Sequence, residues 1–96
     1  MANYKLTKKA ERDLEDIIDY TLQQWGTLQA KTYLDQLETH AQLLANNPDA
    51  GVERENISEN LLSFPYKNHI LYYLKQNHGI TIVRVLHERM DPIKHL

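Results

Sequence analysis

LLSFPYKNHILYYLKQNHGITIVRVLHERMD, residues 61–91, is the stretch that decides the fold. Apolar, aromatic and β-branched residues fill it in three short runs, at residues 61–64, 70–74 and 80–86, and turn-forming residues separate the runs. This pattern predicts three strands in an antiparallel meander. Gly79, after Asn77 and His78, is expected to take the positive φ that a tight hairpin needs. Pro65 has no N–H for a sheet ladder, so it should end the first run or lie on an edge, before a turn at residues 66–68.

The residues before the sheet predict two antiparallel helices. Thr7 is a good N-cap, and a helix from Lys8 is expected to end at Gly26, with Thr27 as the next N-cap. A second helix over residues 28–46 should stop before Pro48. The first helix is expected to bury Ala10, Leu14, Ile17, Ile18, Thr21 and Trp25, and the second Ala30, Tyr33, Leu34, Leu37, Ala41 and Leu44.

Two connecting segments complete the fold. Residues 3–6 form a short extended piece that can join the sheet edge. Residues 48–60 are polar and are interpreted as a loop with one helical turn, in which Val52 and Ile57 are the expected buried anchors. We therefore expect an α+β fold, with an N-terminal helical hairpin packed on one face of a twisted antiparallel sheet of three C-terminal strands. The 96 residues suffice for one domain, residues 1–96.

Composition limits the possible functions. The absence of cysteine excludes disulfides, a thiolate nucleophile and a cysteine zinc site, and favours the cytoplasm. No run approaches the ~20 apolar residues that span a bilayer, and the N-terminus lacks a signal-peptide core, so no membrane contact is expected. Residues 1–60 hold six Lys and Arg against eleven Asp and Glu, whereas residues 61–96 hold five against two. The basic C-terminal part suits an acidic partner. The alternative is that helices are usually richer in Asp and Glu than strands, so that the charge difference has no functional meaning.

The chain contains several short sequence motifs in a fixed order: Gly26-Thr27, Asn47-Pro48-Asp49 with Gly51, Ser63-Phe64-Pro65 leading to His69, and IVRVLH at residues 82–87 followed by Met90-Asp91. In this order and spacing they resemble the ParE branch of the RelE/ParE toxin superfamily, over nearly the whole chain. The resemblance implies a toxin of a type II toxin-antitoxin module. Such a toxin poisons DNA gyrase by stabilising its cleaved DNA state, and a cognate ParD-like antitoxin holds it inactive.

The sequence departs from the family pattern at two positions. Similar sequences commonly have arginine just before the Ser-Phe-Pro motif, where this chain has Leu62. They often have glycine in the turn that follows, where this chain has Lys67. A relative that binds its antitoxin but poisons weakly is therefore a further interpretation.

An enzymatic alternative is a RelE-type ribosome-dependent mRNA endonuclease. That chemistry needs a base, cations at the phosphate and an acid for the leaving oxygen. The candidates are His87 or His69 with Arg84, Lys67 and Arg54. Arg84 and His87 have opposite parity on a regular strand, so they are expected to point to opposite faces. Arg84 can equally bridge a carboxylate such as Glu88 or cap the helical hairpin, and both histidines can be structural.

The preferred interpretation is therefore binding rather than bond-making. A mixture of cations and one adaptable apolar side chain suits an interface, and the expected target or partner site is Arg84, His87, Arg89, Met90 and Lys94. The antitoxin is expected to offer a disordered segment that folds into an apolar groove beside the helices and the sheet edge.

Other residue groups do not indicate chemistry. His87, Glu88 and His95 lack the spacing of a metal site, and no cofactor is indicated. The carboxylates of Glu11, Asp13, Glu15, Asp16 and Asp19 are expected to form a solvated helix face. Tyr66, Tyr72 and Tyr73 are expected in sheet packing, and the acidic chain lacks a basic stripe, so direct sequence-specific nucleic-acid binding is not expected. Trp25 is interpreted as a core anchor, with a partner contact as the alternative.

Overall fold

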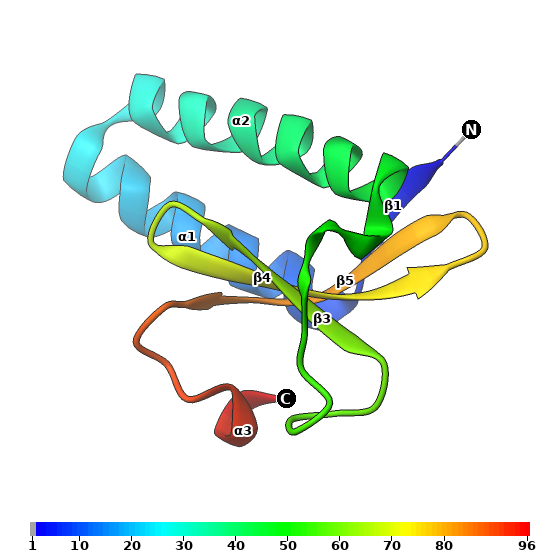
Figure 1. The fold of residues 1–96 in the computed structure, drawn as a ribbon. Helices are drawn as coiled ribbons and strands as arrows, with labels where there is room; N and C mark the ends of the chain where they lie inside the picture. The colour runs from blue at the N-terminus through cyan, green and yellow to red at the C-terminus, as the bar shows by residue number, and fades with distance from the viewer. Residues whose placement is uncertain (1) are drawn as a thin grey trace.

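The structure is a computed structural model that describes residues 2–96. Two long helices lie on one face of a sheet, and a short C-terminal helix lies on the other side (Figure 1). In chain order the elements are β1 (Asn3–Leu6), α1 (Lys8–Trp25), α2 (Thr27–Asn46), the 3-10 turn η1 (Pro48–Ala50), β2 (Val52–Glu53), β3 (Leu61–Tyr66), β4 (His69–Gln76), β5 (Gly79–His87) and α3 (Pro92–His95).

The five strands within residues 2–96 form one sheet in the order β1-β5-β4-β3-β2. The predicted α+β arrangement and the antiparallel meander of β3, β4 and β5 are confirmed. The expected joining of residues 3–6 to the sheet edge is also confirmed, but two details at the edges differ from the prediction. β1 joins β5 in the parallel direction, because the chain crosses over through the helices before it returns to β5. β2 is only two residues long, too short to give a periodic signal, and it pairs with β3 at the opposite edge.

Gly79 determines how β1 meets the sheet. Its φ is +137°, in the positive range predicted for this turn. The backbone N–H of Asn3 donates to the carbonyl of His78 at 2.6 Å. A Cβ atom at position 79 would overlap the carbonyl oxygen of Asn3 and lie 2.9 Å from its nitrogen. Only glycine therefore lets β1 lie this close to the β4–β5 turn.

Thr7 fixes the start of α1, as the N-cap prediction required. Its side-chain oxygen accepts from the N–H of Ala10 at 3.1 Å and donates to the carbonyl of Val83 at 2.8 Å. α1 is thereby anchored to β5 where β1 ends. Gly26 alone joins α1 to α2, with φ at +89°. Gly26, and not the predicted Thr27, takes the N-cap position of α2, because α2 begins one residue earlier than expected.

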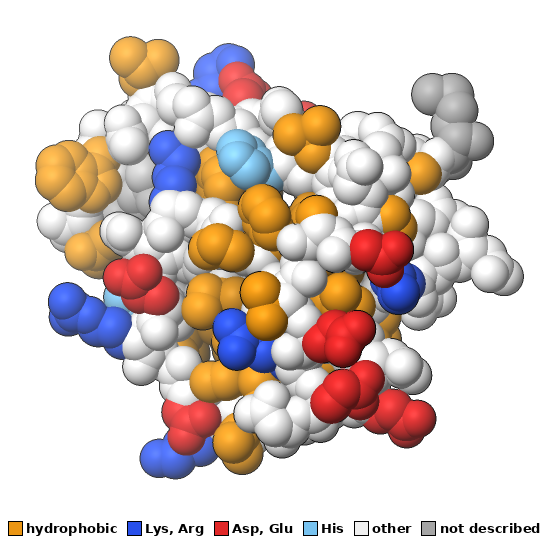
Figure 2. All heavy atoms as spheres, viewed as in Figure 1, with side chains coloured by type: hydrophobic (Ala, Val, Ile, Leu, Met, Phe, Trp, Pro, Cys, Tyr) orange, Lys and Arg blue, Asp and Glu red, His pale blue; other side chains and the backbone are white. Residues whose placement is uncertain are grey.

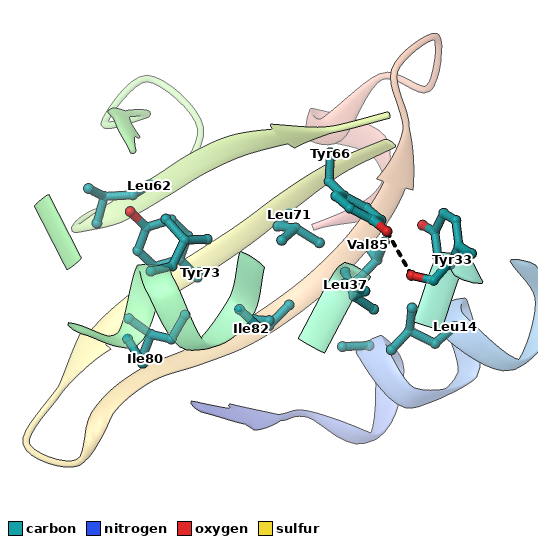
Figure 3. Packing of buried hydrophobic residues seen from close by; sticks show 14 residues of the cluster. Leu14, Tyr33, Leu37, Leu62, Tyr66, Leu71, Tyr73, Ile80, Ile82 and Val85 are labelled. Atoms are coloured by element: carbon teal, nitrogen blue, oxygen red, sulfur yellow. Dashed lines mark hydrogen bonds between the residues drawn. The ribbon is translucent and has the colours of Figure 1, made fainter. Parts of the chain in front are cut away.

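The helices bury a common core against the sheet (Figure 3). Leu14 of α1 and Leu37 of α2 lie beside Val85 of β5, and Ile17 packs against the same cluster. The predicted contact between the helical stripes and residues 70–86 is therefore confirmed. The buried members are Ala10, Leu14, Tyr33, Leu37, Ala41, Leu44, Ala45, Leu62, Tyr66, Leu71, Tyr73, Ile80, Ile82 and Val85.

The other face of the sheet carries a smaller cluster. Leu61, Tyr72 and Leu86 are buried there, and Ile57 packs against them, as expected of an anchor in its loop. This loop and α3 lie below the sheet in Figure 1, opposite α1 and α2. Short segments rather than long helices therefore cover this face.

Two residues predicted to be buried are exposed, so these predictions are wrong. Trp25 is 72% exposed, because the end of the helical hairpin projects beyond the strands (Figure 1), where hydrophobic side chains protrude in Figure 2. Val52 is exposed because it lies on the two-residue edge strand. Within residues 2–96, no helix combines the length and apolar character needed to cross a membrane.

Candidate functional site

A β-bulge sets the geometry at the C-terminal end of β5. Tyr73 pairs with Ile82 and Tyr72 with Arg84, so Val83 is an extra residue in β5. From Arg84 to His87 the pairing is regular again. Arg84 and His87 therefore keep opposite parity, as predicted, and the structure does not bring them together at one phosphate.

Arg84 forms a two-pronged ion pair with Asp13 of α1. Its Nε and one terminal nitrogen donate to the two carboxylate oxygens at 2.8 and 2.9 Å, and the side chains are only 16% and 14% exposed. Asp13 also accepts from the backbone N–H of Val85 at 3.0 Å. The hydrogen bonds that the guanidinium donates to Asp13 raise the pKa of Arg84, so the guanidinium stays charged.

This pair confirms the interpretation that Arg84 bridges a carboxylate, with Asp13 of α1 as the partner in place of the example Glu88. It corrects another interpretation, because Asp13 is not part of a solvated helix face. β1 pairs with β5 only as far as Ile82, so the rest of that strand edge lies open to α1. Asp13 takes the place that a further β1 residue would occupy, and it satisfies an edge N–H of β5.

A groove of about 600 Å³ lies between α1, the β3–β4 turn and the end of β5. Its lining is mainly apolar and aromatic, and the charged residues in it are Asp13, Asp16 and Lys67. The lining residues are Asp13, Asp16, Ile17, Tyr20, Thr21, Trp25, Gln29, Tyr33, Lys67, Asn68, His69, Val85, Leu86, His87 and Met90. The exposed Trp25 is thus a groove residue, which its position in the apolar stripe did not reveal.

Two histidines meet in this groove. His69 and His87 are neighbours across β4 and β5, with ring centroids 5.5 Å apart. The Tyr33 hydroxyl lies 3.3 Å from Nδ1 of His69, and the N–H of Arg89 donates to Nδ1 of His87 at 3.2 Å. Burial raises the pKa of Tyr33, so its hydroxyl stays protonated. Both histidines thus have hydrogen-bond partners, in agreement with the structural interpretation.

The protein is expected to lose stability on acidification through His69. Burial, and then the nearby His87, lower the pKa of His69 below 6.5. The contribution of His69 to stability is fully present above pH 6.5, the ordinary pKa of histidine. As the pH falls from 6.5 towards the lowered pKa, His69 binds a proton in the unfolded chain but not in the folded chain. The free energy of unfolding therefore decreases. Denaturation at pH 7.5 and 5.5 measures this effect, and His69→Gln should show a smaller difference. The control His95→Gln, at an exposed position, should keep the wild-type difference; equal pH dependence of both variants argues against the assignment.

The remaining candidate residues are dispersed. Lys67 lies in the β3–β4 turn with φ at +55°, a conformation that suits the glycine common in similar sequences, and its ammonium lies 5.9 Å from the Tyr66 ring centroid. Arg54 donates to the Ser63 hydroxyl at 2.8 Å. Arg89 and Lys94 are exposed near α3. The groove therefore gathers His69, His87, Lys67 and Met90, but neither Arg84 nor Arg54.

Sequence reasoning missed Asp13 and Tyr33 as site residues, because helical periodicity reports only which face a residue occupies. Leu62, where similar sequences carry arginine, is 5% exposed and belongs to the main core beside Tyr73. Among residues 2–96, no group of three histidine, aspartate or glutamate side chains is arranged to hold a metal ion.

Comparison with known proteins agrees with this architecture. The family model described as "ParE toxin of type II toxin-antitoxin system, parDE" matches residues 4–92. The chain belongs to the ParE toxin family. This ParE-family chain is 32% identical to Toxin ParE1 of Caulobacter vibrioides over 96 residues, covering 100% of this chain and 99% of that protein. It is 35% identical to Toxin ParE1 of Mycobacterium tuberculosis H37Rv over 96 residues, covering 99% and 98%.

A solved structure supports the fold of this ParE-family chain. The chain is similar to one from the structure titled "Chromosomal ParDE TA system from P. aeruginosa", with a TM-score of 0.75 and 19% sequence identity. The match covers 91% of this chain and 96% of that one. This match confirms the fold, and the family model together with the relatives above confirms the ParE resemblance found in the sequence.

Proposed function

We propose that this ParE-family toxin acts in the cytoplasm by binding DNA gyrase, and that it stabilises the state of gyrase in which DNA is cleaved. The observation that carries the proposal is the family match over residues 4–92, together with a sheet whose last strand is followed by the exposed cations Arg89 and Lys94. A ligand shifts a conformational equilibrium only by its differential affinity for the states. A rigid surface that fits one state of gyrase better than the others is therefore sufficient to stabilise that state. The toxin itself does not need to make or break a covalent bond.

The surface that contacts gyrase is the C-terminal end of β5 and residues 88–96. Arg89 and Lys94 are exposed there, and Met90 is partly exposed at the rim of the groove. Cations around an adaptable apolar side chain are suited to a macromolecular interface. His87 contributes from the groove wall. Arg84, held by Asp13, supports this surface from within.

The cognate partner is a ParD-like antitoxin, and its docking site is the groove that Ile17, Tyr33 and Val85 line. A disordered segment that folds on binding fits such a long, mostly apolar surface. Acidic residues in that segment would complement Lys67 at the groove rim and the cations of residues 88–96. Antitoxin bound there would lie beside the proposed gyrase-contacting surface.

Removing the two exposed cations is expected to weaken poisoning. In the double variant Arg89→Ser with Lys94→Ser, about tenfold more toxin should be needed for the same amount of gyrase-cleaved DNA, since rim charges contribute mainly to association. The matched control is Lys8→Ser with Lys9→Ser, which removes the same charge from an exposed part of α1. Equal poisoning by both double variants would contradict the proposed surface.

A second candidate function is RelE-type mRNA cleavage, which the presence of His69, His87 and Lys67 in one groove favours. Translation reactions followed by primer-extension mapping test it against the gyrase assay: cut message supports the ribonuclease, and cleaved DNA complexes support the gyrase poison. A third candidate is a relative that binds antitoxin but has weakened toxicity. Growth arrest on expression without antitoxin excludes that candidate.

A further inference from the structure

The C-terminal segment, residues 88–96, has few attachments to the rest of the protein. The N–H of Glu88 donates to the carbonyl of Asn68 at 2.9 Å, and the N–H of Met90 donates to the carbonyl of His87 at 2.9 Å. α3 is a single turn capped by Asp91, and every residue from 88 to 96 except Pro92 is exposed. Such a short, exposed helix needs an external contact to hold one orientation.

Arg84 supplies that contact. One terminal nitrogen of its guanidinium donates to the backbone carbonyl of His95, while the other two nitrogens are held by Asp13. Among the hydrogen bonds of residues 2–96, this is the one that joins residues 91–96 to the rest of the chain. The planar guanidinium thus links Asp13 of α1 to the backbone of α3 across the edge of β5.

We propose that Arg84 is the positioning residue of the C-terminal segment: Asp13 orients its guanidinium, and the guanidinium fixes the direction in which Arg89 and Lys94 face a partner. Rigid attachment matters, because a mobile segment loses more conformational entropy when it binds. Arg84 therefore acts on target affinity without contacting the target. This role deepens the proposed function. Only the expected effect in the gyrase assay rests on that function; the positioning of residues 88–96 by Arg84 does not.

Arg84→Lys tests the assignment. Lysine keeps the charge beside Asp13, but its single nitrogen replaces the three separated nitrogens that reach Asp13 and His95. A protease specific for arginine, with intact-mass detection, measures cleavage after Arg89 in the folded protein. We expect cleavage to be faster by about tenfold or more than in the wild type, because the segment loses a hydrogen bond to a charged group. Lys75→Gln is the control: it breaks a surface ion pair with Asp49 elsewhere and should leave cleavage unchanged.

A second variant keeps the test valid if Arg84→Lys does not fold. A chain that ends after Lys94 removes the carbonyl of His95 and leaves the Arg84–Asp13 pair in place. It should show the same faster cleavage after Arg89 with an unchanged Tm. Cleavage within twofold of the wild type in both variants would overturn the positioning role, whatever the gyrase assay gives.

The gyrase assay separates the two proposals. If both variants are cleaved faster and the wild type poisons gyrase, Arg84→Lys should need about tenfold more toxin, like the variant lacking Arg89 and Lys94. Poisoning by Arg84→Lys at wild-type concentrations would overturn the link between positioning and target affinity. If the wild type does not poison gyrase at all, the proposed function fails, while faster cleavage still supports the structural role of Arg84.

Discussion

Replacing Gly79 with alanine is expected to lower the free energy of unfolding by more than about 4 kcal/mol. Two effects add. An L-residue at φ +137° is strained, and its Cβ would overlap the carbonyl oxygen of Asn3. β1 would have to leave β5, and the hydrogen bonds between these two strands would be lost. Chemical denaturation followed by circular dichroism measures the change.

Gly26→Ala separates the two effects. Gly26 also has a positive φ, but an added Cβ there has no heavy atom within 4 Å. Only the conformational strain remains, and the expected loss is roughly 1–3 kcal/mol. If Gly79→Ala cost no more than Gly26→Ala, the contact with β1 would not be the reason for glycine at position 79.

Asp13→Ala is expected to cost about 3 kcal/mol of stability. The substitution leaves the mostly buried guanidinium of Arg84 without its carboxylate and leaves the N–H of Val85 without its acceptor. Removing one partner of a buried pair is costly because the other charge stays desolvated. Denaturant unfolding at neutral pH gives the magnitude.

The matched control is Asp35→Ala. Asp35 also pairs with a cation, Lys31, at 2.6 Å, but both side chains are more than half exposed on α2. An exposed pair at this spacing contributes about 0.5 kcal/mol or less. Similar losses for Asp13→Ala and Asp35→Ala would mean that the Arg84 pair is not a structural element of the fold.

The sequence allowed prediction of those parts of the fold that have local causes. Thr7 caps α1 through the N–H of Ala10, three residues along the chain, and the Gly79 turn joins strands that are adjacent in the chain. The predicted apolar stripes of α1 and α2 named most of the buried residues that the helices contribute to the main core, because burial follows helical periodicity. The family could be predicted from the order of the short sequence motifs, from Gly26-Thr27 to Met90-Asp91. This prediction needed no knowledge of which residues are in contact.

The remaining features depend on contacts between distant residues. Asp13 and Arg84 are 71 positions apart, and nothing in the spacing of charges on α1 distinguishes Asp13 from Asp16. Trp25 fits the apolar stripe of α1, yet the helix extends past the strands that would bury it. The bulge at Val83 has no sequence signal of its own, although it sets the face on which each later residue of β5 lies.

The interior place of β5 in the sheet has a consequence for synthesis. β5 lies between β1 and β4, and it also supports α1 and α2, yet it follows all four of these elements in the chain. Before residues 79–87 have been made, β1 has no strand to pair with, and both helices lack the β5 side chains of their common core. The sheet and its helices are therefore expected to reach their final packing only after residues 79–87 have left the ribosome.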